Sequence, residues 1–253
     1  MKVAVIGEGP SGLVTVKYLL KAHLSLDCDP FDARLFELHE TIGGAFATRV
    51  YEDAELVSSE QFTTLFDFCC RQEKEFLSAN DYLQYLKDYC SHFSLWPYIY
   101  LGVEVQSITS TSSKLYTISR SGKDGKVMTW DCDAVAVCSG LHREPNLPVI
   151  PGLHHIPQVI HSFEFKTKNQ FGINKTVMVI GSGETSADIA HLTVNFPTKQ
   201  VLVCHKDGFH FAPKRNPGPV LLPILGRKPD PNEPGIPIDI SGLLRSARPV
   251  IIP

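Results

Sequence analysis

The sequence has little net charge and none of the long apolar runs that a membrane protein would show. Its 253 residues carry a formal net charge of −3, which gives no reason to expect nucleic-acid or membrane binding. No stretch reaches the roughly 18 apolar residues that a membrane span needs. The opening apolar run, Lys2–Ile6, is short and has no cationic leader. We therefore expect neither a membrane span nor a signal peptide.

Common hydrolytic and metal-binding motifs are also missing. The sequence has no H-E-x-x-H, no G-x-S-x-G and no carboxylate-rich metal loop. Its seven cysteines are odd in number and include no C-x-x-C pair, so we expect reduced thiols and a cytoplasmic protein. His154, His155 and His161 lack acidic or cysteine partners nearby, which favours a loop or packing role over a metal site.

What is present is a strand–turn–helix–strand pattern that occurs twice. Residues 2–6 (KVAVI) form an apolar β-branched run, followed by a predicted helix over 11–22 and a strand over 34–38. The second copy places a strand and helix within 175–194 and a strand at 200–205. Such βαβ openings predict an α/β fold with parallel sheets.

The middle of the chain reads differently from its two βαβ openings. An apolar stripe predicts a helix over 78–93, with Ser78 or Asn80 as its N-cap. Alternating strands with polar turns predict an antiparallel meander over 103–109, 114–120 and 126–133. A further apolar strand is expected within 133–140. Ten of the 18 prolines lie between 213 and 253, so regular structure is not expected there.

The strongest motif is G-x-G-x-x-G directly after the first strand. A bound pyrophosphate needs backbone N–H donors, no side chain in its way and the positive end of a helix dipole. Glu37, near the end of the second strand, is placed to accept hydrogen bonds from ribose hydroxyls. A structural glycine turn is the alternative. The candidate dinucleotide-binding residues are Gly7, Gly9, Pro10, Ser11, Gly12 and Glu37.

Three further glycines belong to the same predicted site. Gly43 and Gly44 follow shortly after Glu37, where their backbone could approach a second phosphate or a flavin; a flexible loop is the alternative. Gly140 ends the apolar strand within 133–140 and is included among the candidate cofactor-binding residues.

The second glycine motif predicts a second dinucleotide site. It comprises Gly181, Gly183 and Ser186, the last small enough for close helix packing. At the end of the following strand, His205 and Lys206 stand where an NAD site would place an acid. Such groups suit a ribose 2′-phosphate, so NADPH is favoured over NADH. A solvated strand end is the alternative, and the neighbouring Asp207 weakens the NADPH argument.

Taken together, these residues resemble the flavin-containing monooxygenase family, including its fungal and Baeyer–Villiger-like relatives. The matching segments occur in the family's order: VAVIGEGPSGL, LFELHETIGGAF, ELVSSEQFTTLFDF, DAVAVCSGLHREPNLP, VIHSFEFK and VMVIGSGETSADIA. The resemblance implies that FAD is held by Gly7, Gly9, Gly12, Glu37 and Gly44, and that NADP is held by Gly181, Gly183 and Ser186. It also implies that NADPH reduces FAD, which forms a C4a-hydroperoxide with O₂ and oxygenates a soft nitrogen, sulfur or carbonyl substrate.

The chain departs from the family pattern in three places. In the motif F-x-G-x-x-x-H-S-x-x-[FY], His155 and Pro157 replace the Phe and the Gly. The family's Asn-Thr-Ser-Lys run, whose Asn positions NADP, reads Val-Ser-Ser-Glu over 57–60. Family members are also much longer, so we expect a truncated chain whose sheet lacks its returning strand and exposes an edge.

The expected architecture is therefore two Rossmann-like units, an FAD domain with an inserted NADP domain, in three layers with a small antiparallel meander. We place the FAD-binding domain at 1–148 and the NADP-binding domain at 149–253, Pro-rich and incomplete after about 213. The expected partners are a small-molecule substrate and O₂. The alternatives are an inactive dinucleotide-binding remnant and an NADPH oxidase without coupled oxygenation; these differ from a monooxygenase in FAD binding and in product formation, respectively.

Overall fold

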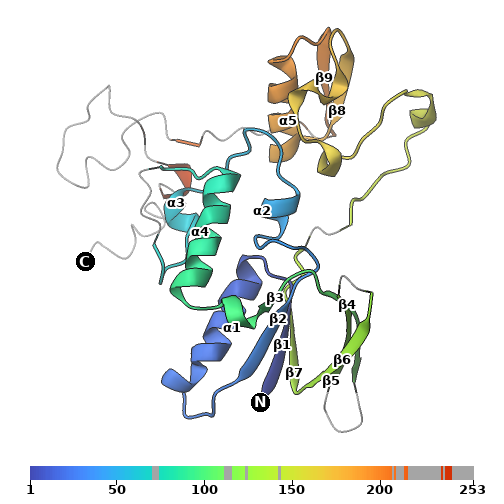
Figure 1. The fold of residues 1–253 in the computed structure, drawn as a ribbon. Coiled ribbons are helices and arrows are strands. Elements are labelled where there is room, and N and C mark those ends of the chain that lie inside the picture. Colours follow the sequence, from blue (N-terminus) through green and yellow to red (C-terminus); the bar gives the residue numbers. More distant parts are fainter. Residues whose placement is uncertain are drawn as a thin grey trace, which may run out of the picture. The chain divides into compact units, whose positions relative to one another are not determined.

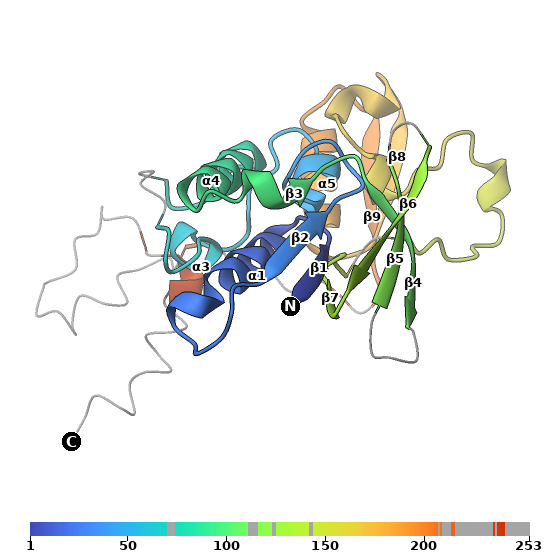
Figure 2. The same ribbon diagram turned by 60° about the horizontal axis from the view of Figure 1, so that its bottom comes forward.

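A computed structural model describes residues 1–69, 74–110, 116–122, 125–141, 144–206, 208, 214–215, 235 and 237–240. The chain divides into two compact units, each built from two separate stretches. Figures 1 and 2 label the helices and strands of both units. Unit 1 combines Met1–Val50 with Asn80–Phe163, and unit 2 combines Tyr51–Ala79 with Glu164–Pro253. The units are thus interleaved along the chain, while the cofactor-domain boundary at 148/149 remains a prediction.

Unit 1 is organised around a parallel sheet of four strands in the order β3-β2-β1-β7. The strands are β1 (Lys2–Ile6), β2 (Asp32–Phe36), β3 (Ile99–Tyr100) and β7 (Ala134–Val137). Val3, Ala4 and Val5 in β1 are all buried, as expected of a strand covered on both faces. The first βαβ prediction is therefore confirmed.

Opposite faces of this sheet pack against different layers. Helix α1 (Pro10–Lys21) buries Leu13 and Val16, and Leu35 of β2 lies next to its Gly12. Residues that point the other way, such as Phe36, pack against an antiparallel meander. Figures 1 and 2 both show α1 on one side of β1 and β2 and the meander on the other. Unit 1 accordingly has three layers: helix, parallel sheet and meander.

The meander consists of three strands in sequential order, β4-β5-β6. They are β4 (Glu104–Ser110), β5 (Tyr116–Ser121) and β6 (Val127–Cys132), paired antiparallel with a register shift between Val105 and Ser107. Ile118 and Cys132 pack with Ala4 and Phe36 in one core cluster. This confirms the predicted meander.

The remaining helices of unit 1 are α2 (Ala45–Thr48) and α4 (Ala79–His92), the latter beginning at the boundary between the units. Helix α4 buries one apolar stripe: Tyr82, Tyr85, Leu86, Tyr89 and Cys90. Its amphipathic spacing explains why the sequence predicted it almost to the residue. Short 3₁₀ turns occur at 22–24, 96–98 and 153–155.

Unit 2 contains the second βαβ element. Strands β8 (Thr176–Ile180) and β9 (Gln200–Cys204) pair in parallel, and α5 (Glu184–Val194) connects them. The buried residues Val177 and Val179 alternate with exposed ones in β8. Helix α3 (Glu60–Thr63) and 3₁₀ turns at 162–164 and 168–171 complete the described elements. The two Rossmann-like units expected from the sequence are thus both present.

One strand was predicted at the wrong position. We expected residues 34–38, whereas β2 covers Asp32–Phe36. Its register with β1 starts at the pair Lys2 and Asp32, and the N–H of Glu37 donates to Tyr100 O at 3.0 Å as the chain leaves the strand. The apolar alternation suggested the strand, but its ends are set by pairing with neighbours that are distant in sequence. Residues 216–234 and 241–253 of the proline-rich tail lie outside the described residues.

In the described ranges, no helix combines the length and apolar character required to cross a bilayer. The same part of the chain holds no group of three or more His, Cys, Asp or Glu side chains placed to bind a metal ion.

Candidate cofactor-binding sites

The turn after β1 requires glycine at two of its three motif positions for packing reasons. Gly7 has φ +96°, and a side chain there would overlap the carbonyl of Cys138. A side chain at Gly12 would overlap the carbonyl oxygen of Gly7. The N–H of Gly7 donates to Phe36 O at 2.9 Å, which fixes the turn to the end of β2. These glycines let helix, turn and strand approach closely.

Gly9 has a different role, because a Cβ added there would have no heavy atom of the described residues within 4 Å. It is the N-cap of α1, its carbonyl accepts the N–H of Leu13 at 3.1 Å, and no side chain caps the helix. Pro10 occupies the first helical position, and Ser11 is exposed beside it. An uncapped helix start with free space above a glycine is the geometry that accommodates a phosphate.

Glu37 follows β2 directly and lies against the glycine turn. Its side chain is buried, and its two carboxylate oxygens accept the N–H groups of Glu8 at 3.2 Å and His39 at 2.8 Å. Each carboxylate oxygen has a second lone pair, so the side chain retains acceptor capacity. The position suits the predicted contact with a ribose, which stays a prediction.

The loop containing Gly43 and Gly44 lies against the same turn, held by a residue that the sequence analysis treated only as a spacer. The Glu8 side chain is 1% exposed, and its carboxyl group accepts the N–H of Gly43 and, at 3.0 Å, that of Gly44. Both glycines have positive φ, and a Cβ on Gly44 would lie 3.2 Å from Gly9 Cα. A carboxylate inside a motif of small residues was the available signal for this contact.

The environment of Glu8 disfavours its charged form. Burial raises its pKa to about 7; the N–H groups of Gly44 and Gly43 act in the opposite direction, and the nearby Glu37 carboxylate adds to the increase. The thiol of Cys90 on α4 also faces this group, and burial followed by the charge of Glu8 raises the Cys90 pKa to about 12. The Glu8 carboxyl group therefore holds a proton more readily than an exposed glutamate does.

Gly140 lies beyond the carboxyl end of β7. It has φ +81°, and a Cβ there would meet no described atom within 4 Å. The N–H of Cys138, two residues earlier, donates to Ile6 O at 2.7 Å at the end of β1. Because β1, β2 and β7 are parallel, Gly7, Glu37 and Gly140 all follow strand ends at one edge of the sheet. That edge is where open α/β sheets bind ligands.

Unit 2 repeats the local geometry of this turn. The N–H of Gly181 donates to Cys204 O at 2.8 Å, as that of Gly7 does to the end of β2, and the N–H of Ala187 donates to Gly183 O at 3.1 Å. Gly183 is the N-cap of α5, and a Cβ there would meet no atom of the described part of the chain within 4 Å. The Ser186 hydroxyl donates to Gly183 O at 2.6 Å. The second motif thus forms an equally open helix start.

The hydrogen bonds also identify the residue in unit 2 that corresponds to Glu37. In each unit the first motif glycine donates to the last residue of the second strand, so His205 takes the place of Glu37. The His205 Nδ1 accepts the N–H of Gly208 at 2.9 Å, and Lys206 is exposed. Asp207 lies outside the described residues. A histidine and a lysine therefore stand where unit 1 has its carboxylate.

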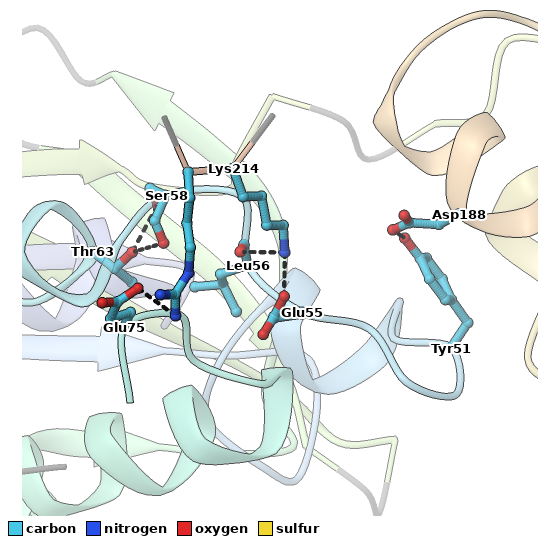
Figure 3. A network of polar contacts seen from close by, with 9 residues as sticks. Tyr51, Glu55, Leu56, Ser58, Thr63, Glu75, Asp188 and Lys214 are labelled. Atoms are coloured by element: carbon cyan, nitrogen blue, oxygen red, sulfur yellow. Dashed lines mark hydrogen bonds and ion pairs between the residues drawn. The ribbon is translucent and has the colours of Figure 1, made fainter. Parts of the chain in front are cut away.

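A contact missing from the sequence analysis connects the segment 51–79 to α5. The Tyr51 hydroxyl donates to Asp188 Oδ2 at 2.7 Å, and the Tyr51 ring lies 5.9 Å from that of Phe165. Figure 3 shows the ends of the Tyr51 and Asp188 side chains meeting. Burial, and next the hydrogen bond to Asp188, raise the pKa of Tyr51 above its usual range. Thr185, one turn earlier in α5, also hydrogen-bonds this hydroxyl. Residues near the second motif are thus held by a distant part of the chain.

Polar contacts within unit 2 also involve the run at 57–60 that departs from the family pattern. Ser58 Oγ lies 2.7 Å from Thr63 Oγ1, and the N–H of Ser59 donates to Asp239 Oδ2 at 2.7 Å. Lys214 pairs with Glu55 in the same network (Figure 3). The serines therefore make structural contacts within the unit.

The histidines predicted to have loop or packing roles lie in irregular structure. His154 and His155 are exposed in a 3₁₀ turn with their rings 3.9 Å apart. His161 Nδ1 accepts the N–H of Phe163 at 3.2 Å, which is a local turn contact.

A comparison with family models matches residues 1–214 to the family described as flavin-binding monooxygenase-like. Among curated proteins, monooxygenase cfoE of Aspergillus candidus is 49% identical over 240 residues, covering 94% of this chain and 41% of that protein. Monooxygenase ptmN of Penicillium ochrochloron is 49% identical over 245 residues, covering 95% of this chain and 40% of that protein. The chain thus spans about 40% of the length of these relatives.

Solved structures show the same fold. The S-allyl-L-cysteine S-oxygenase of Allium sativum superposes with a TM-score of 0.73 at 23% identity, covering 86% of this chain and 54% of that one. The family match extends over both glycine motifs and most of the described residues, and the description of this family names flavin binding. The chain belongs to the flavin-binding monooxygenase-like family of enzymes.

Proposed function

We propose that unit 1 binds FAD, that unit 2 binds NADPH, and that both serve a monooxygenase acting on a small molecule with O₂. One observation carries the proposal: the same uncapped, glycine-lined helix start is built twice, after β1 and after β8, with matching hydrogen bonds to the neighbouring strand. One chain with two such sites suits a flavin and the nicotinamide that reduces it.

The residues of unit 1 fit the diphosphate and ribose of FAD. Gly9 leaves space above the N-terminus of α1, where backbone N–H groups and the helix dipole stabilise phosphate oxygens. Gly7 and Gly12 allow that approach, and Glu37 accepts from a ribose hydroxyl. Gly44 brings a second segment of backbone against the turn, and Gly140 leaves the adjacent strand end open.

The residues of unit 2 fit NADPH in the same way. Gly181, Gly183 and Ser186 shape the phosphate position, and Lys206 supplies a positive charge for the 2′-phosphate next to His205. A carboxylate at the place of His205 would instead favour the free 2′-hydroxyl of NADH.

A bound flavin would supply the redox chemistry between NADPH and O₂, so no protein nucleophile is required. The protein holds the two dinucleotides and orients them. We propose a soft nitrogen, a sulfur or a carbonyl group as the oxygen acceptor, and a cytoplasmic location.

The first test is the visible absorption spectrum of the purified protein, before and after anaerobic addition of NADPH. A flavin band that bleaches would support both sites, and coupled oxygenated product would support the monooxygenase. Bleaching followed by peroxide release without product would identify an NADPH oxidase. If no flavin band forms with excess FAD, the chain is an inactive remnant and the proposal is wrong.

A substitution in unit 2 distinguishes the proposed NADPH site from the proposed FAD site. Gly183→Ala adds a methyl group that meets no heavy atom within 4 Å among the residues that the structure describes, so unit 2 should fold normally. We expect this variant to keep its flavin band but to bleach only at much higher NADPH concentration. Loss of the flavin band instead would show that Gly183 does not act in the NADPH site alone.

A further inference from the structure

Glu8 connects three parts of the FAD site that are separate in sequence. Its carboxyl group accepts the N–H groups of Gly43 and Gly44, and its own N–H donates to Glu37 at 3.2 Å. The side chain is 1% exposed, so these contacts form away from water. The turn after β1, the end of β2 and the glycine loop are thereby held together at one residue.

The position of the glycine loop depends on this carboxyl group. Gly44 lies against Gly9, at the point where the proposed FAD diphosphate approaches the helix start. Without an acceptor at residue 8, two largely buried N–H groups would lose their partners, at a cost of about 1–3 kcal/mol each. A neutral carboxyl group still offers a carbonyl oxygen to one of them, so the loop contact does not require a charge.

The groups around Glu8 disfavour a negative charge on its own carboxyl group. The titratable groups that face it in the described structure are Glu37 at the end of β2 and the thiol of Cys90 on α4, neither of which is cationic. In this setting Glu8 titrates with a pKa of about 7. A diphosphate at the adjacent helix start adds negative charge and therefore favours the protonated carboxyl group.

We propose that Glu8 is a positioning residue of the FAD site and that its carboxyl group takes up a proton when the FAD diphosphate binds. This inference rests on the proposed FAD site. The sign follows from linkage: a ligand that raises the pKa of a group binds with proton uptake, so its affinity falls as the pH rises above the pKa of the free protein. FAD should therefore bind most tightly on the acid side of neutrality.

The test is the dissociation constant of FAD, measured by flavin fluorescence between about pH 6 and about pH 9. For the unmodified protein we expect the constant to rise about 15-fold from pH 7 to pH 8.5, given a free-protein pKa of about 7 and a carboxyl group that stays protonated in the complex over this range. Glu8→Gln is permanently neutral and should give a constant that varies less than about twofold over this range. Glu104→Gln, at an exposed position in β4, is the matched control and should follow the unmodified protein.

A second measurement uses the unmodified protein alone, so it does not depend on the variant folding. Calorimetric titration with FAD at about pH 8, in two buffers of different ionisation enthalpy, should show uptake of about one proton. A pH-independent dissociation constant, an absence of proton uptake, or a pH profile retained in Glu8→Gln would overturn the inference while leaving the FAD site intact. Absence of FAD binding at every pH would refute the proposed function, and this inference with it.

Discussion

Two glycines of the first motif, Gly9 and Gly12, should respond in different ways to the same substitution. Gly12→Ala places a methyl group onto the carbonyl oxygen of Gly7, a backbone atom that cannot rotate away. Gly9→Ala places it in open space, and the φ of −61° at Gly9 is one that alanine adopts without strain. We expect the first change to destabilise the fold and the second to affect cofactor binding alone.

The magnitude for Gly12 follows from two opposing effects. Overpacking in a close-packed region costs about 1–3 kcal/mol, and a clash with backbone belongs at the upper end. Alanine recovers up to about 1 kcal/mol relative to glycine inside a helix. The net loss should be about 2 kcal/mol, which moves a urea midpoint by roughly 1 M for a typical dependence on denaturant. Gly9→Ala should leave this midpoint unchanged.

The assay combines urea unfolding followed by far-ultraviolet circular dichroism with a fluorescence titration of FAD. We expect Gly9→Ala to keep the unfolding midpoint and to weaken FAD binding at least tenfold, because its methyl group occupies the approach of the phosphate. Equal destabilisation by both variants would refute the packing argument. Unchanged FAD affinity in Gly9→Ala would refute the assignment of the open helix start.

Three further predictions concern single side chains. Tyr51→Phe removes the 2.7 Å hydrogen bond to Asp188, and because both residues are partly exposed we expect about 1 kcal/mol of destabilisation in urea unfolding. Lys206→Glu should raise the NADPH concentration needed for half-maximal flavin bleaching by about tenfold, because one charge-assisted contact to the 2′-phosphate is lost. The NADH concentration needed for half-maximal bleaching should not change, because NADH has no 2′-phosphate. The raised pKa of Glu8 means that the folded state binds more protons, so stability should fall by about 3 kcal/mol between about pH 4.5 and about pH 7. Glu8→Gln should lack that fall when unfolding midpoints are compared across pH.

The elements that could be predicted from sequence are those whose pattern is local. The apolar run of β1, the amphipathic stripe of α4 and the alternation of the meander each depend on neighbours a few residues away. Both glycine motifs could be placed for the same reason, since the turn and helix of each form within one short segment. The ends of β2 could not, because pairing with β1 and β3 determines them.

The contacts missed in the site all join residues far apart in the chain. Glu8 reaches Gly43 and Gly44, and Tyr51 reaches Asp188 across 137 positions. No periodicity or spacing encodes such pairs, because they arise only when tertiary folding brings two segments together. The acidic residue within the first glycine motif was a usable signal that Glu8 has hydrogen-bond partners elsewhere in the chain. A buried carboxylate without such partners would cost several kcal/mol.

The two motifs also show why the third glycine of such a pattern can be replaced in one unit and not in the other. A side chain at Gly12 would overlap the Gly7 carbonyl, whereas a Cβ built on Gly181 would lie 3.6 Å from the actual Cβ of Ser186, an ordinary contact. Helix α5 therefore accepts a side chain beside its turn where α1 does not. Ser186 also uses its hydroxyl group to bond Gly183 O, within the first turn of α5. The residue type at the third position thus reports how closely helix and turn approach, and the cofactor preference must be sought at the strand end, where Glu37 in unit 1 corresponds to His205 in unit 2.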